Sequence, residues 1–363
     1  MQEIIETVSL KKQLEQVLHM LGSRHFLLVC GSAVDRLPAE EALSTLSVRW
    51  SRFSEFSPNP QYESVIRGVE AYRNNGCDAI VALGGGSAID VAKCIKLYAG
   101  LDLTRSCLQQ AYKDTGIPLI AIPTTAGTGS EATCFAVIYK NGEKQSVMHE
   151  SILPQYALLA PTLLDSLPLY QRKATMLDAF CHAAESMWSI KATEASRLLA
   201  ERALKIWMHS WRGYLDNRRE DNAAMLRASN LAGQAINITQ TTAAHAMSYK
   251  LTSLFGIAHG HAAACCLLPV WRYLIENAWR LEVSADTREG LERLTLCLCA
   301  DCQQDAWDWF ARLMEHLQML DLPKCSEDEL QMLTKSVNLL RLKNYPMLLD
   351  EKTLKRMYQE LLP

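Results

Sequence analysis

Short apolar runs alternate with mixed polar segments through the first half of the chain. Runs at 26–30, 79–83 and 118–122 are almost wholly apolar and lead into turns of glycine, serine or threonine, a pattern that predicts buried strands. A helix is expected at 62–74, after a Pro-Asn-Pro break. Strands that alternate with helices predict parallel βαβ units, and therefore an α/β fold. Further strands are expected at 46–53, 136–140 and 156–159.

The pattern changes after Leu167-Pro168. Long stretches rich in Ala, Leu, Glu and Arg follow, and clusters of β-branched residues nearly vanish. Because these four residues favour helices, we expect an all-helical domain at 168–363, behind an α/β domain at 1–167. The 363 residues suffice for two domains of ordinary size, each with its own core.

Composition excludes several classes of partner. Apolar residues make up 49% of the chain, charged residues 21%, and the net charge is -3, so no global basic field attracts nucleic acid or an anionic membrane. The first twenty residues mix charges with apolar side chains, unlike a signal peptide, and the chain has no apolar run of about eighteen residues. We therefore expect a cytoplasmic protein with a small-molecule substrate.

Two glycine-rich turns follow predicted strands. The first is Gly84-Gly-Gly-Ser87, which leads into a helix, and the second is Thr124-Thr-Ala-Gly-Thr-Gly-Ser130. Glycines let an anion approach the backbone, and a helix N-terminus offers free N–H groups to phosphate. The first spacing fits neither common phosphate-binding motif, so a plain tight turn is the alternative. Two such turns at strand ends favour a dinucleotide between them.

The end of the first predicted strand bears on the choice of dinucleotide. Gly31 and Ser32 follow it, and the next acidic residue is Asp35. In many dinucleotide folds an acidic residue here binds the ribose 2′-hydroxyl, whereas a small or basic one admits a 2′-phosphate. The sequence thus favours NADPH over NADH.

Four side chains in the second half have the chemistry of one metal site. Asp178 and His182 are four residues apart in a segment of good helix formers, so they leave the same face of a helix. His245 and His259 come later, the second in what we expect to be a loop, bracketed by glycines. Three imidazoles and one carboxylate suit a first-row divalent ion, with Fe²⁺ and Zn²⁺ the leading candidates.

Taken together, these motifs resemble the iron-containing, group III alcohol dehydrogenases. The resemblance extends over roughly residues 26–270 through Asn59-Pro60, Gly84 to Lys93, Pro123 to Glu131, Asp178 to His182 and His245 to His259. It implies a dehydroquinate synthase-like fold, with an N-terminal dinucleotide-binding α/β domain and a C-terminal all-helical domain that binds metal. It also implies a homodimer.

Site residues carried over from this resemblance form two sets. The implied metal ligands are Asp178, His182, His245 and His259. The expected cofactor contacts are Gly31, Ser32, Asn59, Gly85, Gly86, Ser87, Asp90, Thr124, Thr125, Thr128 and Lys144. The alternative for Asp90 is that its negative charge stabilises the N-terminal end of its helix without touching the cofactor.

The chain departs from the family pattern beside the third ligand. Family members often carry a second histidine four residues later, where this chain has Tyr249, followed by Lys250. The i+4 spacing places Tyr249 on the ligand-bearing face, although a core tyrosine is the alternative. The block from His245 to Lys250 looks closest to phosphonoacetaldehyde reductases, and a lysine near the metal suits a phosphonate. A solvated surface lysine is the alternative reading of Lys250.

The resemblance implies reduction of an aldehyde by NAD(P)H, here phosphonoacetaldehyde to 2-hydroxyethylphosphonate. Tyr249, His261 or a cofactor hydroxyl could supply the proton, and His261 could instead be structural. Alternative substrates are sulfoacetaldehyde, lactaldehyde and simple aliphatic aldehydes. One alternative function is a metal-dependent lyase or hydrolase, which would use the four ligands. Another is a non-catalytic binding protein that keeps the fold. Neither needs the two glycine turns together as a dinucleotide site.

Overall fold

A computed structural model describes residues 2–36, 43–280 and 283–362. The chain forms two compact units. The first comprises the residues up to Leu167 together with Asn217–Leu226, and the second comprises Pro168–Asp216 and the residues from Arg227 onward.

A six-stranded parallel sheet forms the centre of the first unit, which confirms the predicted α/β fold. Its strands, in spatial order, are β1 (Glu3–Glu6), β8 (Tyr156–Leu159), β5 (Leu119–Pro123), β4 (Ala79–Gly84), β2 (His25–Cys30) and β3 (Arg49–Phe53). A separate antiparallel pair joins β6 (Phe135–Lys140) to β7 (Glu143–Met148). The sequence did not predict β1 or β7, because their charged residues hide the apolar pattern.

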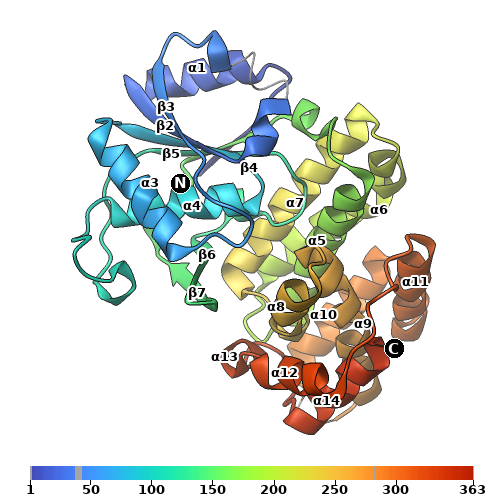
Figure 1. Ribbon diagram of the computed structural model, residues 1–363. Coiled ribbons are helices and arrows are strands. Elements are labelled where there is room, and N and C mark those ends of the chain that lie inside the picture. The colour runs from blue at the N-terminus through green and yellow to red at the C-terminus, as the bar shows by residue number, and fades with distance from the viewer. Residues whose placement is uncertain (1, 37–42, 281–282, 363) are drawn as a thin grey trace. The chain divides into compact units, whose positions relative to one another are not determined.

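Side chains of the central strands alternate between two buried cores. In β2, Leu27 and Val29 point into one core, whereas Phe26 and Leu28 point into the other. Helices α3 (Tyr62–Asn74) and α4 (Gly86–Tyr98) cover the first face, and α1 (Leu10–Met20) covers the second (Figure 1). Since both faces are buried, the strands read as continuous apolar runs, which is why the sequence predicted them.

The direction of the chain across the sheet reverses between β2 and β4. From β2 the chain moves to the edge strand β3, whereas from β4 it moves the other way, through β5 to β8. In open parallel sheets, ligands bind outside the carboxyl ends of the strands at such a reversal. Gly31 follows β2, Gly85 follows β4 and Thr124 follows β5, so three predicted cofactor segments share this edge.

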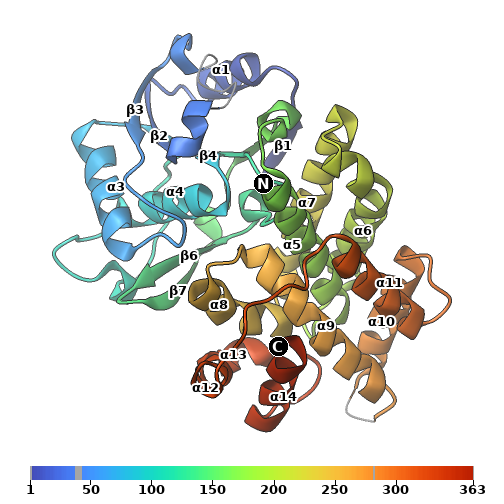
Figure 2. The same ribbon diagram turned by 45° about the vertical axis from the view of Figure 1, so that its right-hand side comes forward.

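The second unit is helical, as predicted. Its helices are α5 (Leu169–Trp188), α6 (Glu194–Leu215), α8 (Ala243–Phe255), α9 (His259–Asn277), α10 (Ala285–Cys297), α11 (Gln303–His316), α12 (Glu327–Ser336), α13 (Leu339–Leu342) and α14 (Glu351–Leu361), and α7 (Arg219–Thr239) lies between α6 and α8 in the chain. α5 packs against α6 and α9, and α8 packs against α9 (Figure 2). Within the described ranges, no helix is both long and apolar enough to span a bilayer.

The two glycines around His259 have different structural roles. The loop predicted around His259 is shorter in the structure, because α9 already begins at this residue. Gly256, with φ +68, ends α8 in the left-handed conformation, whereas His259 is already the first residue of α9. Gly260 lies inside α9, where an added Cβ would come within 2.1 Å of the Ala174 carbonyl oxygen and 2.6 Å of Asp178 Cβ. Glycine here therefore permits close contact between α9 and α5.

Candidate functional site

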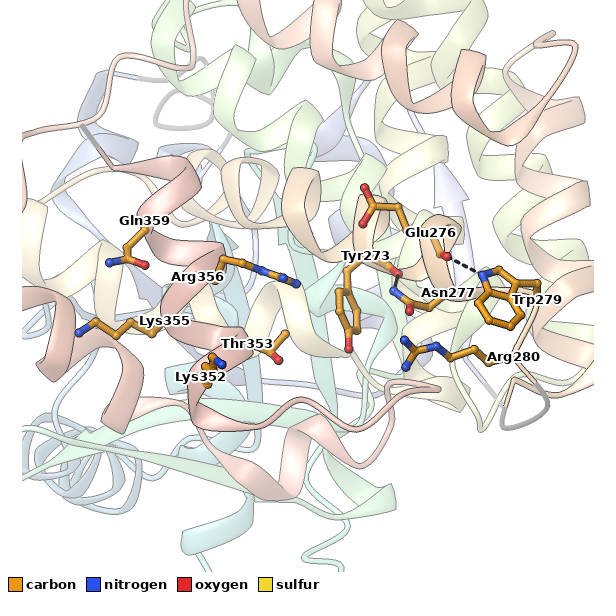
Figure 3. Close-up of a pocket in the computed structure, with 10 residues that line it drawn as sticks. All are labelled: Tyr273, Glu276, Asn277, Trp279, Arg280, Lys352, Thr353, Lys355, Arg356 and Gln359. Carbon is orange, nitrogen blue, oxygen red and sulfur yellow. Dashed lines mark hydrogen bonds between the residues drawn. The ribbon is translucent and has the colours of Figure 1, made fainter.

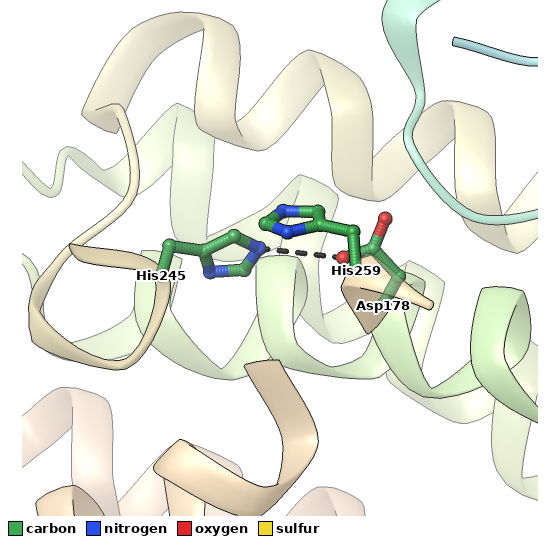
Figure 4. Close-up of side chains that lie close together, drawn as sticks. All are labelled: Asp178, His245 and His259. Atoms are coloured by element: carbon green, nitrogen blue, oxygen red, sulfur yellow. Dashed lines mark hydrogen bonds and ion pairs between the residues drawn. The ribbon is translucent and has the colours of Figure 1, made fainter. Parts of the chain in front are cut away.

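Three of the four predicted metal ligands converge in the second unit. Asp178 on α5, His245 on α8 and His259 on α9 each present one ligand atom, and these atoms all lie within 4.8 Å of one another (Figure 4). Asp178 Oδ1 is 3.4 Å from His245 Nε2. Asp178 and His245 are buried, while His259 is half-buried, so the cluster is sheltered from bulk water on one side.

His182, the fourth predicted ligand, lies beside this group. Its Nε2 is 3.9 Å from Asp178 Oδ1, and its ring stacks on His245 with centroids 4.5 Å apart. The i+4 spacing on α5 accounts for its direction. The structure thus brings Asp178, His245 and His259 tightly together, with His182 slightly farther out.

Charges in the cluster suit a cation. Burial raises the pKa of the Asp178 carboxyl, but the imidazoles of His182, His245 and His259 outweigh burial and hold this pKa well below its usual value. Burial lowers the pKa of His245, whereas Glu185 and Asp178 raise it, with a net rise to about 10. A cation that binds His245 Nε2 must therefore displace a proton. An ionised, buried carboxylate among three imidazoles fits a divalent transition metal.

Glu185, on α5, supports His245 and was missed by the sequence analysis. It is fully buried, and its Oε1 accepts from the N–H groups of Thr242 (3.0 Å) and Ala244 (3.1 Å), and from the Thr242 hydroxyl. Its Oε2 accepts from His245 Nδ1, so Nε2 is the nitrogen left to bind an ion. Glu185 follows Asp178 by seven residues, or two helical turns, and this spacing could have identified it.

Tyr249 lies on the ligand-bearing side of α8, as its spacing predicted. Its ring is parallel to that of His259, with centroids 5.4 Å apart and planes 3° apart. The Arg341 guanidinium carbon lies 5.4 Å from the centre of the same tyrosine ring. Lys250 follows Tyr249 and is half-buried. The part of the helix that departs from the family pattern thus borders the ligand cluster.

His261 has a protein partner at each ring nitrogen. Nε2 donates to the Met319 carbonyl (2.9 Å), which leaves Nδ1 to accept from the Tyr170 hydroxyl (3.1 Å). That hydroxyl accepts in turn from the Ala258 N–H group (3.0 Å). Burial lowers the pKa of His261 although the Met319 carbonyl opposes this, so the imidazole is neutral. The chain of hydrogen bonds fixes the backbone directly before His259.

In the first unit, the two glycine-rich turns touch each other. A Cβ added to Gly86 would lie 2.9 Å from Thr128 Cγ2, and a Cβ added to Gly85 would lie 3.4 Å from Thr125 Oγ1. The Thr124 N–H group donates to the Gly84 carbonyl at 3.1 Å, which joins the turns at their base. Half-buried hydroxyls and the N-terminus of α4 therefore meet at the carboxyl edge of the sheet, and this is a cradle suited to phosphate. Ser87 lies in the first turn of α4.

Asp90 and Lys93 tie α4 to the segment that follows the second turn. Asp90 Oδ1 accepts from Ser130 Oγ (2.6 Å), and Oδ2 accepts from the Val137 N–H group (2.9 Å). Lys93 is fully buried, and its ammonium group donates to Ser130 Oγ (3.1 Å), to Thr133 Oγ1 (2.9 Å) and to a main-chain carbonyl (2.8 Å). Both Asp90 oxygens thus have protein donors outside α4, which indicates that Asp90 positions the second turn, a role that the sequence analysis did not consider.

Gly31 and Ser32 lie at the end of β2, beside a cation that the sequence analysis did not single out. Arg52 donates to the Gly31 carbonyl at 3.4 Å and forms an ion pair with Asp35 at 2.6 Å. Ser32 begins a short 3₁₀ helix. This edge of the sheet therefore carries one arginine and one aspartate close to the predicted cofactor segment.

Asn59 and Lys144 lie in one region of the first unit, at the β6–β7 hairpin. Asn59 adopts a left-handed conformation with φ +59. The next residue, Pro60, accepts at its carbonyl from the Tyr139 N–H group (2.8 Å), and Tyr139 pairs with Lys144 across the β6–β7 hairpin. The hairpin lies against α4, since the Val137 N–H group of β6 donates to Asp90 Oδ2.

A further pocket, of about 780 Å³, lies between α9 and α14 in the second unit and contains none of the predicted site residues (Figure 3). Two of its cations already have acidic partners, since Lys355 pairs with Glu327 and Arg356 pairs with Glu360. Its lining residues are Tyr273, Glu276, Asn277, Trp279, Arg280, Lys352, Thr353, Lys355, Arg356 and Gln359.

Comparison with known proteins places the chain in one family. Residues 3–161 match the family model of iron-containing alcohol dehydrogenases, and residues 173–329 match the model of the C-terminal region of the same family. Sulfoacetaldehyde reductase from Bilophila wadsworthia is 29% identical over 348 residues, which cover 88% of each chain. Phosphonoacetaldehyde reductase from Streptomyces viridochromogenes is 36% identical over 224 residues, 58% of this chain and 57% of that one.

A solved structure extends the likeness over nearly the whole chain. Sulfoacetaldehyde reductase from Bifidobacterium kashiwanohense, in complex with NAD⁺, superposes with a TM-score of 0.88 at 26% identity, and the match covers 99% of this chain and 96% of that one. The fold agrees with this likeness. The chain therefore belongs to the iron-containing alcohol dehydrogenases and is an oxidoreductase of that family.

Proposed function

We propose that the protein reduces phosphonoacetaldehyde to 2-hydroxyethylphosphonate with a nicotinamide cofactor. The observation that carries this proposal is the stacking of Tyr249 on His259, with the half-buried Lys250 following Tyr249 in α8, because a cation near the ligands would suit an anionic substrate. Two relatives are named for sulfoacetaldehyde and phosphonoacetaldehyde, both of which are two-carbon aldehydes with an acidic head group. These names support an anionic aldehyde as the substrate class.

In this proposal Asp178, His182, His245 and His259 hold a divalent ion, Fe²⁺ or Zn²⁺. When bound, such an ion supplies a Lewis acid that polarises a carbonyl group. Asp178 contributes the negative charge, and Glu185 keeps His245 in the orientation and tautomer that a ligand needs. Gly260 and the Tyr170–His261 hydrogen bond keep His259 close to Asp178.

The residues that would hold the pyrophosphate of the cofactor are Gly85, Gly86 and Ser87 of the first turn and Thr125 and Thr128 of the second. When bound, a nicotinamide cofactor would supply the chemistry of hydride transfer, so the task of the protein is alignment and exclusion of water.

We assign NADPH as the favoured cofactor. Ser32 stands where an acidic residue would select NADH, and Arg52 provides a cation at the same sheet edge that suits a 2′-phosphate. Asp35 partly offsets that charge.

Tyr249 is the proton donor in this proposal. Its ring stacks on His259, whereas both nitrogens of His261 are engaged by Tyr170 and Met319. The Tyr249 hydroxyl would deliver the proton that the product alcohol requires. His261 then acts by holding the backbone before His259. We also propose that the protein is a cytoplasmic homodimer. Sedimentation of the purified protein tests whether it is a dimer.

One assay tests the substrate. Iron-loaded protein is supplied with NADPH and with phosphonoacetaldehyde, sulfoacetaldehyde, lactaldehyde or acetaldehyde in turn, and kcat/KM is compared. We expect phosphonoacetaldehyde to be the best substrate, and Lys250→Ala to lower kcat/KM for the two anionic aldehydes selectively. Acetaldehyde reduced at least as efficiently as phosphonoacetaldehyde would refute the proposed substrate.

A further inference from the structure

Arg341 lies one aromatic ring away from a candidate metal ligand. Its guanidinium carbon is 5.4 Å from the centre of the Tyr249 ring, and that ring is parallel to the His259 imidazole, with centroids 5.4 Å apart. We propose that Arg341 binds the anionic head group of the aldehyde and thereby sets the substrate class. This inference rests on the proposed aldehyde reductase activity.

The arginine is anchored, which suits a binding role. Its Nη1 donates to Thr241 Oγ1 at 3.3 Å, and Thr241 directly precedes the N-cap of α8. The Asn344 amide donates to the Thr241 carbonyl at 3.3 Å, so the chain after α13 is joined to the same residue. A half-buried guanidinium held by a hydroxyl and an aromatic ring loses little further freedom when it binds an oxyanion.

The carboxylates nearest to the ligand cluster are already engaged. Asp178 is surrounded by imidazoles, and Glu185 accepts from Thr242, Ala244 and His245. These anions are therefore balanced within the cluster. Arg341, which lies over the Tyr249 ring, adds positive charge beside the cluster, and this charge favours an anionic aldehyde over a neutral one.

The geometry of the head group explains why an arginine is suited to this position. In phosphonoacetaldehyde a single methylene separates the carbonyl carbon from phosphorus, so the group that binds the phosphonate must lie close to the ligand cluster. Arg341 lies over Tyr249, and the Tyr249 ring lies 5.4 Å from the His259 ring, so one aromatic ring separates the guanidinium from the nearest candidate ligand. Its planar fork of donors can bind two oxygens of a tetrahedral oxyanion at once, whereas Lys250 offers a point charge.

The test compares Arg341→Gln and Arg341→Lys with the wild-type metal-loaded enzyme. The matched control is Lys343→Gln, which removes the same charge from an exposed residue two positions later. Two quantities are measured: kcat/KM for phosphonoacetaldehyde and for acetaldehyde, and the dissociation constant of ethylphosphonate, an unreactive anion, by titration calorimetry.

We expect Arg341→Gln to lower kcat/KM for phosphonoacetaldehyde about 10- to 100-fold, as loss of a charge-assisted hydrogen bond predicts, and to weaken ethylphosphonate binding by a similar factor. Acetaldehyde turnover should change less than about threefold, because a neutral substrate gains little from the guanidinium. Arg341→Lys should restore part of the loss, and Lys343→Gln should change neither quantity.

Equal losses for both aldehydes, or an unchanged ethylphosphonate constant, would overturn the role of Arg341. Failure of the proposed function has a different signature, in which the wild-type enzyme itself prefers acetaldehyde. In that case the ethylphosphonate titration still decides whether Arg341 forms an anion site.

Discussion

Glu185 determines which nitrogen of His245 can bind an ion, because His245 Nδ1 donates to its carboxylate. In Glu185→Gln, the amide oxygen can still accept from Thr242 and Ala244, but the NH₂ group would face His245 Nδ1. An NH₂ donor at this place favours the His245 tautomer that carries its hydrogen on Nε2. We expect the affinity for Fe²⁺ or Zn²⁺, measured by chelator competition, to fall about 10- to 100-fold. Ser186→Ala, at the next buried position, is the control. Unchanged affinity in Glu185→Gln would contradict this role.

At the glycine turns, a single methyl group should weaken cofactor binding. Gly86→Ala would bring a carbon to 2.9 Å from Thr128 Cγ2, which requires one turn to move away from the other. We expect the dissociation constant of NADPH, measured by fluorescence titration, to rise roughly tenfold, while metal affinity stays constant. Gly100→Ala, which meets a threonine methyl at 3.2 Å outside both turns, should bind NADPH normally. Normal NADPH binding by Gly86→Ala would remove the turns from the proposed site.

The contact between α5 and α9 depends on Gly260. Gly260→Ala would place Cβ 2.1 Å from the Ala174 carbonyl oxygen, so α9 must shift and carry His259 away from Asp178. We expect a loss of about 1–3 kcal/mol in unfolding free energy, together with loss of metal binding. Gly290→Ala is a matched control, since its Cβ would meet the Met187 carbonyl oxygen at 1.9 Å, away from His259. It should lose stability but retain the ion, and equal metal affinity in both variants would argue against this mechanism.

Lys93 should make the link between α4 and the second turn dependent on pH. Burial lowers its pKa from 10.5 to about 8, although Asp90 opposes the shift. Between about pH 8 and pH 10.5 the unfolded chain binds more protons than the folded one, so the free energy of unfolding rises with pH. Below pH 8 Lys93 is protonated in both states and adds no pH dependence. Relative to Lys93→Met, the wild-type unfolding free energy should rise by up to about 3 kcal/mol across this window. Urea denaturation at pH 7.5, 8.5 and 9.5 tests this, and a constant difference would refute it.

The elements that the sequence predicted best are those with a local signal. The central strands are buried on both faces, and Asp178 and His182 share a helix, so short spacing was enough. Arg341 was missed because its partner Tyr249 lies 92 residues away, and only the packing of α8 and α13 brings them together. The partner of Glu185, His245, lies 60 residues away, so the spacing of Glu185 from Asp178 was its one local signal. Gly260 was taken as part of a loop because its packing partner is also on another helix.

At the scale of the whole molecule, the two proposed ligands bind to different units. The candidate metal ligands all belong to the second unit, and the glycine turns belong to the first. We expect metal to slow hydrogen exchange in α5, α8 and α9, and NADPH to slow it around the start of α4. At a free ion concentration of 100 times the dissociation constant, the stabilisation should be about 2.7 kcal/mol. Absence of metal-dependent protection in α5 and α8 would contradict the proposed ligands.

The order of the ligands along the chain has a consequence for biosynthesis. Asp178 is made about midway through translation, but the cluster is incomplete until His259 has left the ribosome and α9 has docked on α5. Loading of the ion must therefore follow translation of most of the second unit, and the metal available in the cell at that moment competes for the nascent site. Expression in iron-depleted, zinc-rich medium would then yield folded protein that carries zinc at these ligands.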